Sequence, residues 1–350
     1  MTVCGYKTCP RIPSCIFIDI NLFNLREHIV YGVVTILLNG TIALLLAQAA
    51  TGNLDIGAAI GNLISIVWGI ISNLWILLII LLFIIPVLQR GAINRARERI
   101  LTKISHERKS QVITLIHRQE TIAFLGIPLS RYIDIDDSEE ILRAIRITPP
   151  DVPIDLIVHT PGGIALAATQ IAMALKAHPA KKTVIVPHYA MSGGTMIALA
   201  ADEILMDPHA VIGPVDPQLA NKDGQFAAVS ILKAVKEKPV DKIGDTTLML
   251  ADDARKAQEQ MIIFVREIMK GKCGEPNMDK IISELVMGKY THDYPIFPEM
   301  AKELLGDCVK VGIPRSVYEL MEFYKMAMGA HRPGVEYIPV APPGGPQQRR

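Results

Sequence analysis

The sequence predicts an α/β fold with a mostly parallel β-sheet and surrounding helices, preceded by an N-terminal transmembrane helical hairpin. Two segments of the sequence predict the sheet, Ile154–His159 and Thr183–Val186. Each is short and β-branched, and each leads through a glycine-containing turn into a run of good helix formers. Strands that alternate with helices at this spacing are typical of parallel sheets. A third observation predicts the hairpin, because two long stretches near the N-terminus are apolar and uncharged.

Composition and charge exclude several classes of function. The 350 residues carry a formal net charge of +1, so a general affinity for nucleic acid is not expected. No G-x-G-x-x-G follows a strand, and no H-E-x-x-H or zinc cluster is present, so no cofactor and no metal are expected. The five cysteines, Cys4, Cys9, Cys15, Cys273 and Cys308, are too few and too scattered for a disulfide framework. The three within the first fifteen residues are expected to be spare thiols rather than a metal knuckle, because no CxxC or partner histidine supports a metal site.

The two apolar stretches, Ile29–Ala50 and Leu63–Leu88, are each long enough to cross a hydrocarbon core, which takes about 20 helical residues. A re-entrant or interfacial first stretch is the alternative, because Asn39 would lie near mid-bilayer. The stretch 89–110 is basic, whereas the loop between the spans carries only Asp55 as a charged residue. The positive-inside rule therefore places the N-terminus and everything after the second span in the cytoplasm.

The chain divides into five parts on this basis. They are an N-terminal cytoplasmic segment (1–28), two transmembrane helices (29–88), a basic juxtamembrane helix (89–110), a soluble domain (111–330) and a disordered tail (331–350). The tail contains proline, glycine and terminal arginines, a composition that does not bury enough apolar surface to fold.

Within the soluble domain, β-branched runs predict strands and apolar periodicity predicts helices. The first helix should begin at Asp136, where carboxylates lie at its positive end, and should stop at Thr148 before two prolines. The predicted strands are Val112–Ile116, Tyr132–Ile135, Ile154–His159, Thr183–Val186 and Glu203–Met206. The further helices are predicted to begin at Ile164, near Gly194, and at Ala227, Thr246 and Met278.

The turn that contains Ser192 is the strongest candidate for chemistry. In parallel sheets the functional crevice lies at the C-terminal ends of the strands, so this turn should face Thr160–Gly163. Ser192 either caps the following helix or acts as a nucleophile beside the helix N-terminus. The backbone N–H of Gly193 and that of Gly162 or Gly163 are candidate oxyanion donors, since glycine lets a substrate approach closely. The alternative for the two glycines of the first turn is simply a tight turn with a proline-preset start.

The general base cannot be chosen from the residues alone. His159, His188 and His209 all lie near the candidate loops, although a histidine at a strand end is more often structural. Lys233 is the other candidate. It shares a helical face with other polar side chains, and that position favours an ordinary solvated lysine over a catalytic base.

Several ordered motifs between Val112 and Tyr324 resemble the serine dehydrogenase proteinase family. That family is a membrane-anchored branch of the clan that holds signal peptide peptidase A and the Clp proteolytic subunit. The motifs are His159–Gly163, Tyr189–Thr195, Gly213–Gln218, Arg118–Glu120, Tyr132–Ile135 and Thr291–Ile296.

The resemblance implies a crotonase/Clp-protease-like fold with Ser192 as nucleophile. Relatives similar to signal peptide peptidase A use a lysine further along the chain as base, and Lys233 stands at the matching separation. The Clp-type histidine would stand at about Gly213-Pro214, so that base is absent. Relatives assemble into rings or dimers, which implies a homo-oligomer.

The sequence thus predicts a membrane-anchored serine endopeptidase with a Ser192–Lys233 dyad and a Gly163/Gly193 oxyanion hole. Its expected partners are a peptide or membrane-protein substrate and, through the N-terminal helices, the lipid bilayer, with no nucleic acid. One alternative is a catalytically silent membrane scaffold on the same fold. Another is a crotonase-type acyl-CoA enzyme, for which Asp216 is the nearest acidic candidate, although an Asp-Pro pair more often forms a turn.

Overall fold

The fold was analysed in a computed structural model. The structure describes residues 56–117, 123–124, 127–128, 132–221, 224–274, 277–326 and 335–338. The chain forms two compact units, Met1–Val87 and Leu88–Arg350, and the boundary falls within the long helix α2 (Ile56–Arg108). The second unit contains every strand of the described residues.

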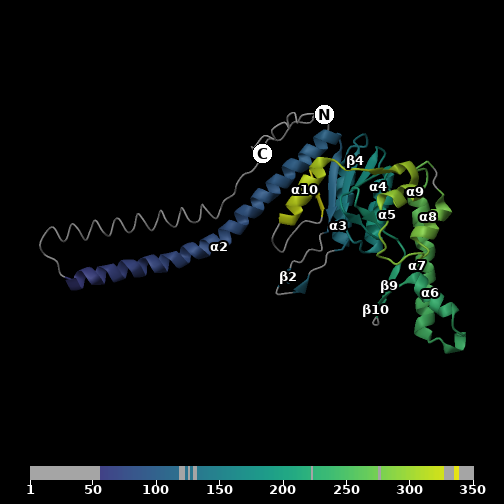
Figure 1. Ribbon diagram of the computed structural model, residues 1–350, viewed down its shortest axis with the longest axis horizontal. Coiled ribbons are helices and arrows are strands. Elements are labelled where there is room, and N and C mark those ends of the chain that lie inside the picture. The colour runs from purple at the N-terminus through teal and green to yellow at the C-terminus, as the bar shows by residue number, and fades with distance from the viewer. Residues whose placement is uncertain are drawn as a thin grey trace, which may run out of the picture. The chain divides into compact units, whose positions relative to one another are not determined.

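A six-stranded sheet in the order β11-β7-β5-β4-β1-β12 forms the centre of the second unit (Figure 1). All neighbouring strands are parallel except β12, which pairs antiparallel with β1. Every residue of β1, β4, β5 and β7 is buried, as expected for parallel strands covered on both faces. The strands are β1 (Gln111–Ile116), β4 (Ile154–His159), β5 (Lys182–Val186), β7 (Glu203–Met206), β11 (Val309–Val311) and β12 (Val335–Tyr337).

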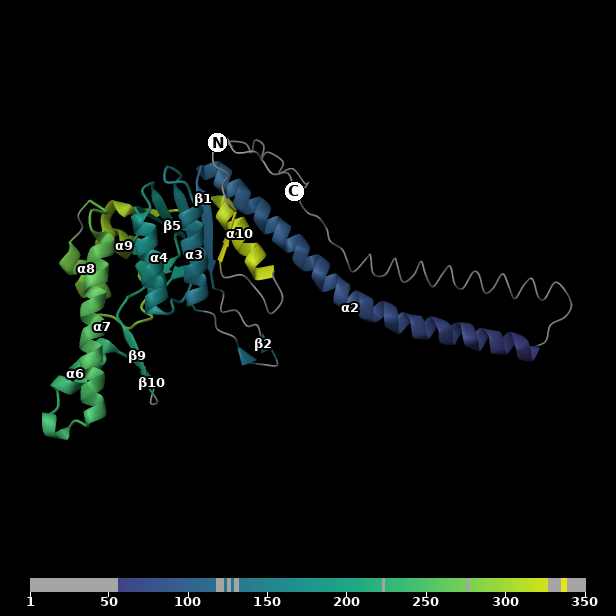
Figure 2. The ribbon, with the colours of Figure 1, turned by 180° about the vertical axis from the view of Figure 1, so that it is seen from behind.

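Helices cover both faces of this sheet (Figures 1 and 2). On one face, α10 and the C-terminal part of α2 bury Leu101, Ile104 and Tyr324 against the sheet. The other face packs on α3, α4, α5, α7, α8 and α9 through a larger apolar cluster. The helices are α3 (Ile135–Ile147), α4 (Ala165–Ala177), α5 (Gly193–Leu199), α6 (Ala228–Lys236), α7 (Asp245–Met269), α8 (Met278–Leu285), α9 (Pro298–Leu305) and α10 (Arg315–Met326).

Short elements complete the unit. The two-residue strands β6 and β8 pair in parallel at the edge of the candidate site, and the hairpin β9–β10 leads into α6. The remaining elements are β2 (Ala123–Phe124), β3 (Ile127–Pro128), β6 (Tyr189–Ala190), β8 (Val211–Ile212), β9 (Gln218–Asn221), β10 (Gly224–Ala227) and the 3₁₀ turns Val240–Lys242 and Gly306–Cys308.

The predicted parallel α/β fold is confirmed, with two local differences. Tyr132–Ile135 is not a strand: Ile133 makes an isolated bridge to Gly163, and α3 already begins at Ile135. Asp134 causes this early start, because its side chain accepts from Asp137 N while the Asp137 carboxylate accepts from Asp134 N, forming a capping box. The stretch expected to be a disordered tail contributes β12, which adds an edge strand to the sheet.

Cys273 and Cys308 form a disulfide with a Cα–Cα distance of 5.0 Å, although the sequence indicated no disulfide framework. It joins the turn after α7 to the turn before β11, across a sequence separation of 35 residues. Such a distant pair leaves no spacing signal in the sequence. The other three cysteines lie outside the described residues.

The first predicted membrane span, Ile29–Ala50, also lies outside the described residues, and the second, Leu63–Leu88, lies within α2. Judged by length, hydropathy and charge together, none of the helices that the structure describes qualifies as a membrane span.

Candidate active site

Four backbone segments lie side by side at the C-terminal ends of β4 and β5. Thr160 bridges to Ala190, β6 pairs with β8, and Ile212 bridges to Ile296. The predicted meeting of the two glycine turns is therefore observed, since Met191 N donates to Thr160 O at 3.0 Å.

Ser192 stands at the sharp turn between β6 and α5. Its backbone has φ 50° and ψ −115°, a conformation that costs a non-glycine residue about 1–3 kcal/mol. Two hydrogen bonds hold the turn: Gly194 N donates to Met191 O (2.8 Å) and Met196 N donates to Ser192 O (3.1 Å). The Ser192 side chain makes no capping hydrogen bond to α5 and is partly exposed. The structure thus favours the nucleophile interpretation over that of a helix cap.

The turn that faces Ser192 requires glycine. Gly162 has φ 108°, and a Cβ there would lie 2.7 Å from Ser192 Cβ. A Cβ on Gly163 would lie 2.2 Å from Ile133 O. At Gly193 it would lie 2.8 Å from Ala168 Cβ and 3.7 Å from Gly163 N, so this glycine and the facing turn are in close contact.

Hydrogen bonding separates the candidate oxyanion donors. Gly162 N already donates to Thr160 Oγ1 at 3.2 Å. The N–H groups of Gly163 and Gly193 make no hydrogen bond among the described residues, and both border the Ser192 turn. Gly163 and Gly193 are accordingly the pair whose N–H groups can meet an oxyanion.

A buried polar chain that the sequence analysis missed supports the glycine turn from behind. His117 Nδ1 lies 3.0 Å from Thr160 Oγ1, and His117 Nε2 lies 3.1 Å from Asp137 Oδ2. All three side chains are buried. The available signal was the position of His117 directly after a buried strand, where functional side chains gather in parallel sheets.

A second pair that the sequence analysis missed is His292 and Asp216. Their Nδ1 and Oδ1 atoms lie 2.8 Å apart, and Gln218 Nε2 donates to the other carboxylate oxygen at 2.7 Å. The Asp216 side chain is 1% exposed and that of His292 is 32% exposed. Both residues lie in motifs that resemble the family, but a pairing across 76 positions leaves no local pattern in the sequence.

The residues that the sequence offered as bases lie in other contacts. The rings of His159 and His188 stack at 5.6 Å, and His159 also packs on Tyr189 at 4.3 Å. His209 is exposed in the loop after β7. Lys233 is exposed on α6 and has no ion pair with any residue that the structure describes. Helix α6 packs on the N-terminal half of α7 and lies apart from α4 in both views (Figures 1 and 2).

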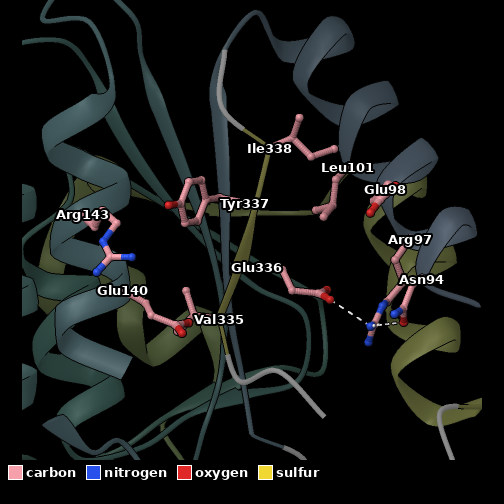
Figure 3. Close-up of a pocket in the computed structure, with 10 residues that line it drawn as sticks. All are labelled: Asn94, Arg97, Glu98, Leu101, Glu140, Arg143, Val335, Glu336, Tyr337 and Ile338. Atoms are coloured by element: carbon pink, nitrogen blue, oxygen red, sulfur yellow. Dashed lines mark hydrogen bonds and ion pairs between the residues drawn. The ribbon is translucent and has the colours of Figure 1, made fainter. Parts of the chain in front are cut away.

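A cavity of about 330 Å³ opens elsewhere, between α2, α3 and β12 (Figure 3). Arg97 pairs with Glu336 there at 2.9 Å and donates to Asn94 at 2.7 Å. Burial raises the pKa of Glu336, although Tyr324 and Arg97 oppose that shift. This cavity contains none of the predicted site residues.

The fold and this site define a ClpP-like serine hydrolase arrangement. Residues 63–350 match the family of ClpP-like SDH-type serine proteinases, and the chain belongs to that family. The resemblance inferred from the motifs is thereby confirmed.

Similar proteins include two uncharacterized proteins of Methanocaldococcus jannaschii. One is 56% identical over 272 residues, covering 77% of this chain and 93% of that protein. The other is 54% identical over 264 residues, covering 75% and 88%. Among solved structures, a serine-to-alanine mutant of the membrane-bound stomatin-specific protease 1510-N is 21% identical, with a TM-score of 0.37, covering 55% of this chain and 79% of that one.

Proposed function

We propose that this member of the serine proteinase family is an active endopeptidase whose nucleophile is Ser192. The observation that carries the proposal is the strained Ser192 turn, whose hydroxyl is not used as a cap and which contacts the turn holding Gly163. A serine on such an elbow, beside two backbone donors, is the arrangement that acyl transfer requires.

The geometry supports the following reaction. Ser192 Oγ attacks the substrate carbonyl carbon while a base takes the hydroxyl proton, and the N–H groups of Gly163 and Gly193 stabilise the resulting oxyanion. The proton then passes to the departing amine and an acyl-enzyme remains. Water hydrolyses this ester by the reverse sequence of proton transfers. Loss of one oxyanion donor in such a site typically slows turnover by about 10²–10³-fold.

Lys233 is the base that the family resemblance implies. A lysine must be neutral to accept the proton, which requires burial or a neighbouring positive charge. Lys233 is exposed on α6 of the single chain. Lys233 would therefore act as base only where a second copy of the chain covers it.

Apolar side chains beside the glycine turn support an apolar peptide as substrate. Ile164 follows Gly163 directly and is 48% exposed, and Leu166, in the first turn of α4, is 60% exposed. Tyr132 is 51% exposed next to the Ile133–Gly163 bridge. Exposed apolar groups around a reactive serine favour burial of apolar substrate side chains.

Membrane anchoring through the N-terminal region is part of the same proposal. Large apolar side chains on the N-terminal part of α2 are exposed, among them Trp68 (72%), Trp75 (63%) and Leu82 (64%). Such an apolar surface is unfavourable in water and favourable in the hydrocarbon core of a lipid bilayer. The basic stretch that follows supports a cytoplasmic catalytic unit.

Labelling with a fluorophosphonate probe tests the proposal. The full chain in detergent should form a covalent adduct at Ser192 and cleave an apolar fluorogenic peptide. The Ser192→Ala variant should do neither while keeping the same melting temperature. A catalytically silent scaffold would give no adduct with the unmodified chain, and that result would refute the proposed activity.

A further inference from the structure

Three neighbouring backbone segments at the site run toward the same end of it. They carry Ser192, Asp216 and His292. Strands β6 and β8 are parallel, with Ala190 opposite Ile212. The bridge between Ile212 and Ile296 is antiparallel and is made by two hydrogen bonds of 3.1 and 2.8 Å. Residues after Ala190, residues after Ile212 and residues before Ile296 consequently run in one direction.

Contacts at Gly213 keep these three segments together beyond the bridges. Gly213 N donates to Thr195 Oγ1 at 3.0 Å. A Cβ on Gly213 would lie 2.4 Å from Met191 Cε and 3.6 Å from Tyr294 O. Gly213 therefore touches both the residue before Ser192 and a residue two positions from His292. Neighbouring strands lie about 4.8 Å apart, so roughly 10 Å separates the outer two backbones, a span that serine and histidine side chains can close.

The hydrogen bond that His292 donates to Asp216 sets the orientation of the His292 ring. A carboxylate only accepts, so Nδ1 of His292 carries the proton that is donated to Asp216 Oδ1 at 2.8 Å. In the neutral ring this leaves the lone pair on Nε2, the nitrogen on the far side from Asp216. The second oxygen of Asp216 accepts from Gln218, and the carboxylate is buried, so the pair is held in a fixed orientation.

We propose that His292, oriented by Asp216, is the general base that activates Ser192; this inference rests on the proposed function. As the bond from Ser192 Oγ to the substrate carbonyl carbon forms, the Oγ–H bond breaks and its proton moves to His292 Nε2. Asp216 keeps its charge and stabilises the imidazolium. When the C–N bond of the peptide breaks, the same proton goes to the departing amine.

His292 meets the requirements of a base within one chain, whereas Lys233 does not. The His292 ring is partly exposed, which gives a substrate access, and its orienting carboxylate is already bonded. Lys233 is exposed and makes no ion pair with the residues that the structure describes.

The test compares single substitutions in the full chain, in detergent. His292→Ala should lower both kcat/KM for the apolar peptide and the rate of fluorophosphonate labelling by about 10²–10⁴-fold. Added imidazole should restore part of the labelling rate, because it can occupy the vacated site and accept the proton. Asp216→Asn should also slow labelling, because an amide N–H₂ turned toward Nδ1 favours the wrong tautomer. The control His106→Gln, an exposed histidine of α2, should keep the original rate.

A folded His292→Ala variant that keeps the original labelling rate would overturn the inference. So would a loss in Lys233→Met that equals the loss in Ser192→Ala, because the base would then be the lysine. If His292→Ala lowers the melting temperature, the size-matched His292→Gln variant takes its place, with the same expected loss. Undiminished peptide cleavage by Ser192→Ala would instead refute the serine peptidase itself, so the two failures are distinguishable.

Discussion

Gly163 shows how one missing side chain makes the candidate site possible. A Cβ there would lie 2.2 Å from Ile133 O and 2.3 Å from Ile133 N. These are backbone atoms that cannot turn away, and Ile133 also accepts from Ile164 N and donates to Gly162 O. The Gly163→Ala variant should therefore lose fluorophosphonate labelling and melt at a lower temperature, because the turn and Ile133 must separate.

Gly244→Ala is the matched control, since nothing lies within 4 Å of a Cβ at Gly244. It should retain both labelling and melting temperature. A Gly163→Ala variant with unchanged labelling would show that the turn is dispensable for the reactivity of Ser192.

Thr160 connects the buried His117–Asp137 pair to the glycine turn. Thr160 Oγ1 lies 3.0 Å from His117 Nδ1, and His117 Nε2 lies 3.1 Å from Asp137 Oδ2. Thr160 Oγ1 in turn accepts from Gly162 N. The Thr160→Val variant keeps the shape but leaves two buried polar groups unpaired, each at a cost of about 1–3 kcal/mol.

Chemical denaturation should therefore reveal a lower free energy of unfolding for Thr160→Val, and labelling of Ser192 should slow because Gly162 is no longer anchored. Thr102→Val is the control, because that exposed hydroxyl only donates to Glu98 O within α2. Equal stability of the two variants would contradict the role assigned to the buried chain.

At the scale of elements, Asp202 ties β5 to the segment after α7. Its two carboxylate oxygens pair with Lys182 Nζ (3.0 Å) and Lys272 Nζ (2.7 Å), and both lysines are buried. Burial alone would raise the pKa of Asp202, but hydrogen bonds from Lys272 and Lys182 outweigh it and hold the pKa below its ordinary value. Burial lowers the pKa of Lys272 despite this partner.

The sign of the pH dependence follows from that lowered carboxyl pKa. Asp202 is more acidic folded than unfolded, so its contribution is present above the unfolded value and is lost as the pH falls through the folded one. Asp202→Asn should lower the melting temperature by several degrees at neutral pH, where about 2–4 °C corresponds to 1 kcal/mol. The difference should shrink below about pH 4. Asp253→Asn, exposed on α7, is the control, and a difference that persists unchanged into acid would contradict the ion-pair explanation.

Elements were predictable where the signal is local. Buried strands and amphipathic helices have periodic patterns, and the helix after Asp134 has its capping carboxylates in sequence. The pairings that build the site are not local: Ile212 with Ile296, and His292 with Asp216. The same holds for the disulfide between Cys273 and Cys308 elsewhere in the unit. Each joins segments across a helix or more of intervening chain, so only the fold brings them together.

At the scale of the whole molecule, the order of the strands in the sheet could not be predicted from the sequence either. Parallel neighbours were expected, but not the antiparallel β12, which comes from a stretch whose composition indicated disorder. The Ser192 turn was recognisable because a strand, a glycine turn and a helix follow one another in sequence. The sequence thus indicated the proposed nucleophile, Ser192, better than it indicated the proposed general base, His292, and its partner Asp216.

The division of the chain at Val87 leads to a prediction about the whole molecule. All described strands and every candidate site residue belong to the unit Leu88–Arg350, whereas Trp68, Trp75 and Leu82 belong to the other unit. A chain that begins at Leu88 should therefore keep fluorophosphonate labelling of Ser192 but lose affinity for lipid. Transfer of apolar surface out of water contributes about 25 cal/mol per Å², so several exposed tryptophan and leucine side chains suffice for strong partitioning.

Co-sedimentation with phosphatidylcholine vesicles measures this. The full chain should pellet with the vesicles and resist extraction by carbonate, because apolar rather than ionic contacts hold it. The chain from Leu88 should stay in the supernatant, still labelled at Ser192. A full chain that remains in solution would refute membrane anchoring and leave the peptidase proposal intact. Loss of labelling in the shorter chain would show instead that the N-terminal unit is needed for the site to form.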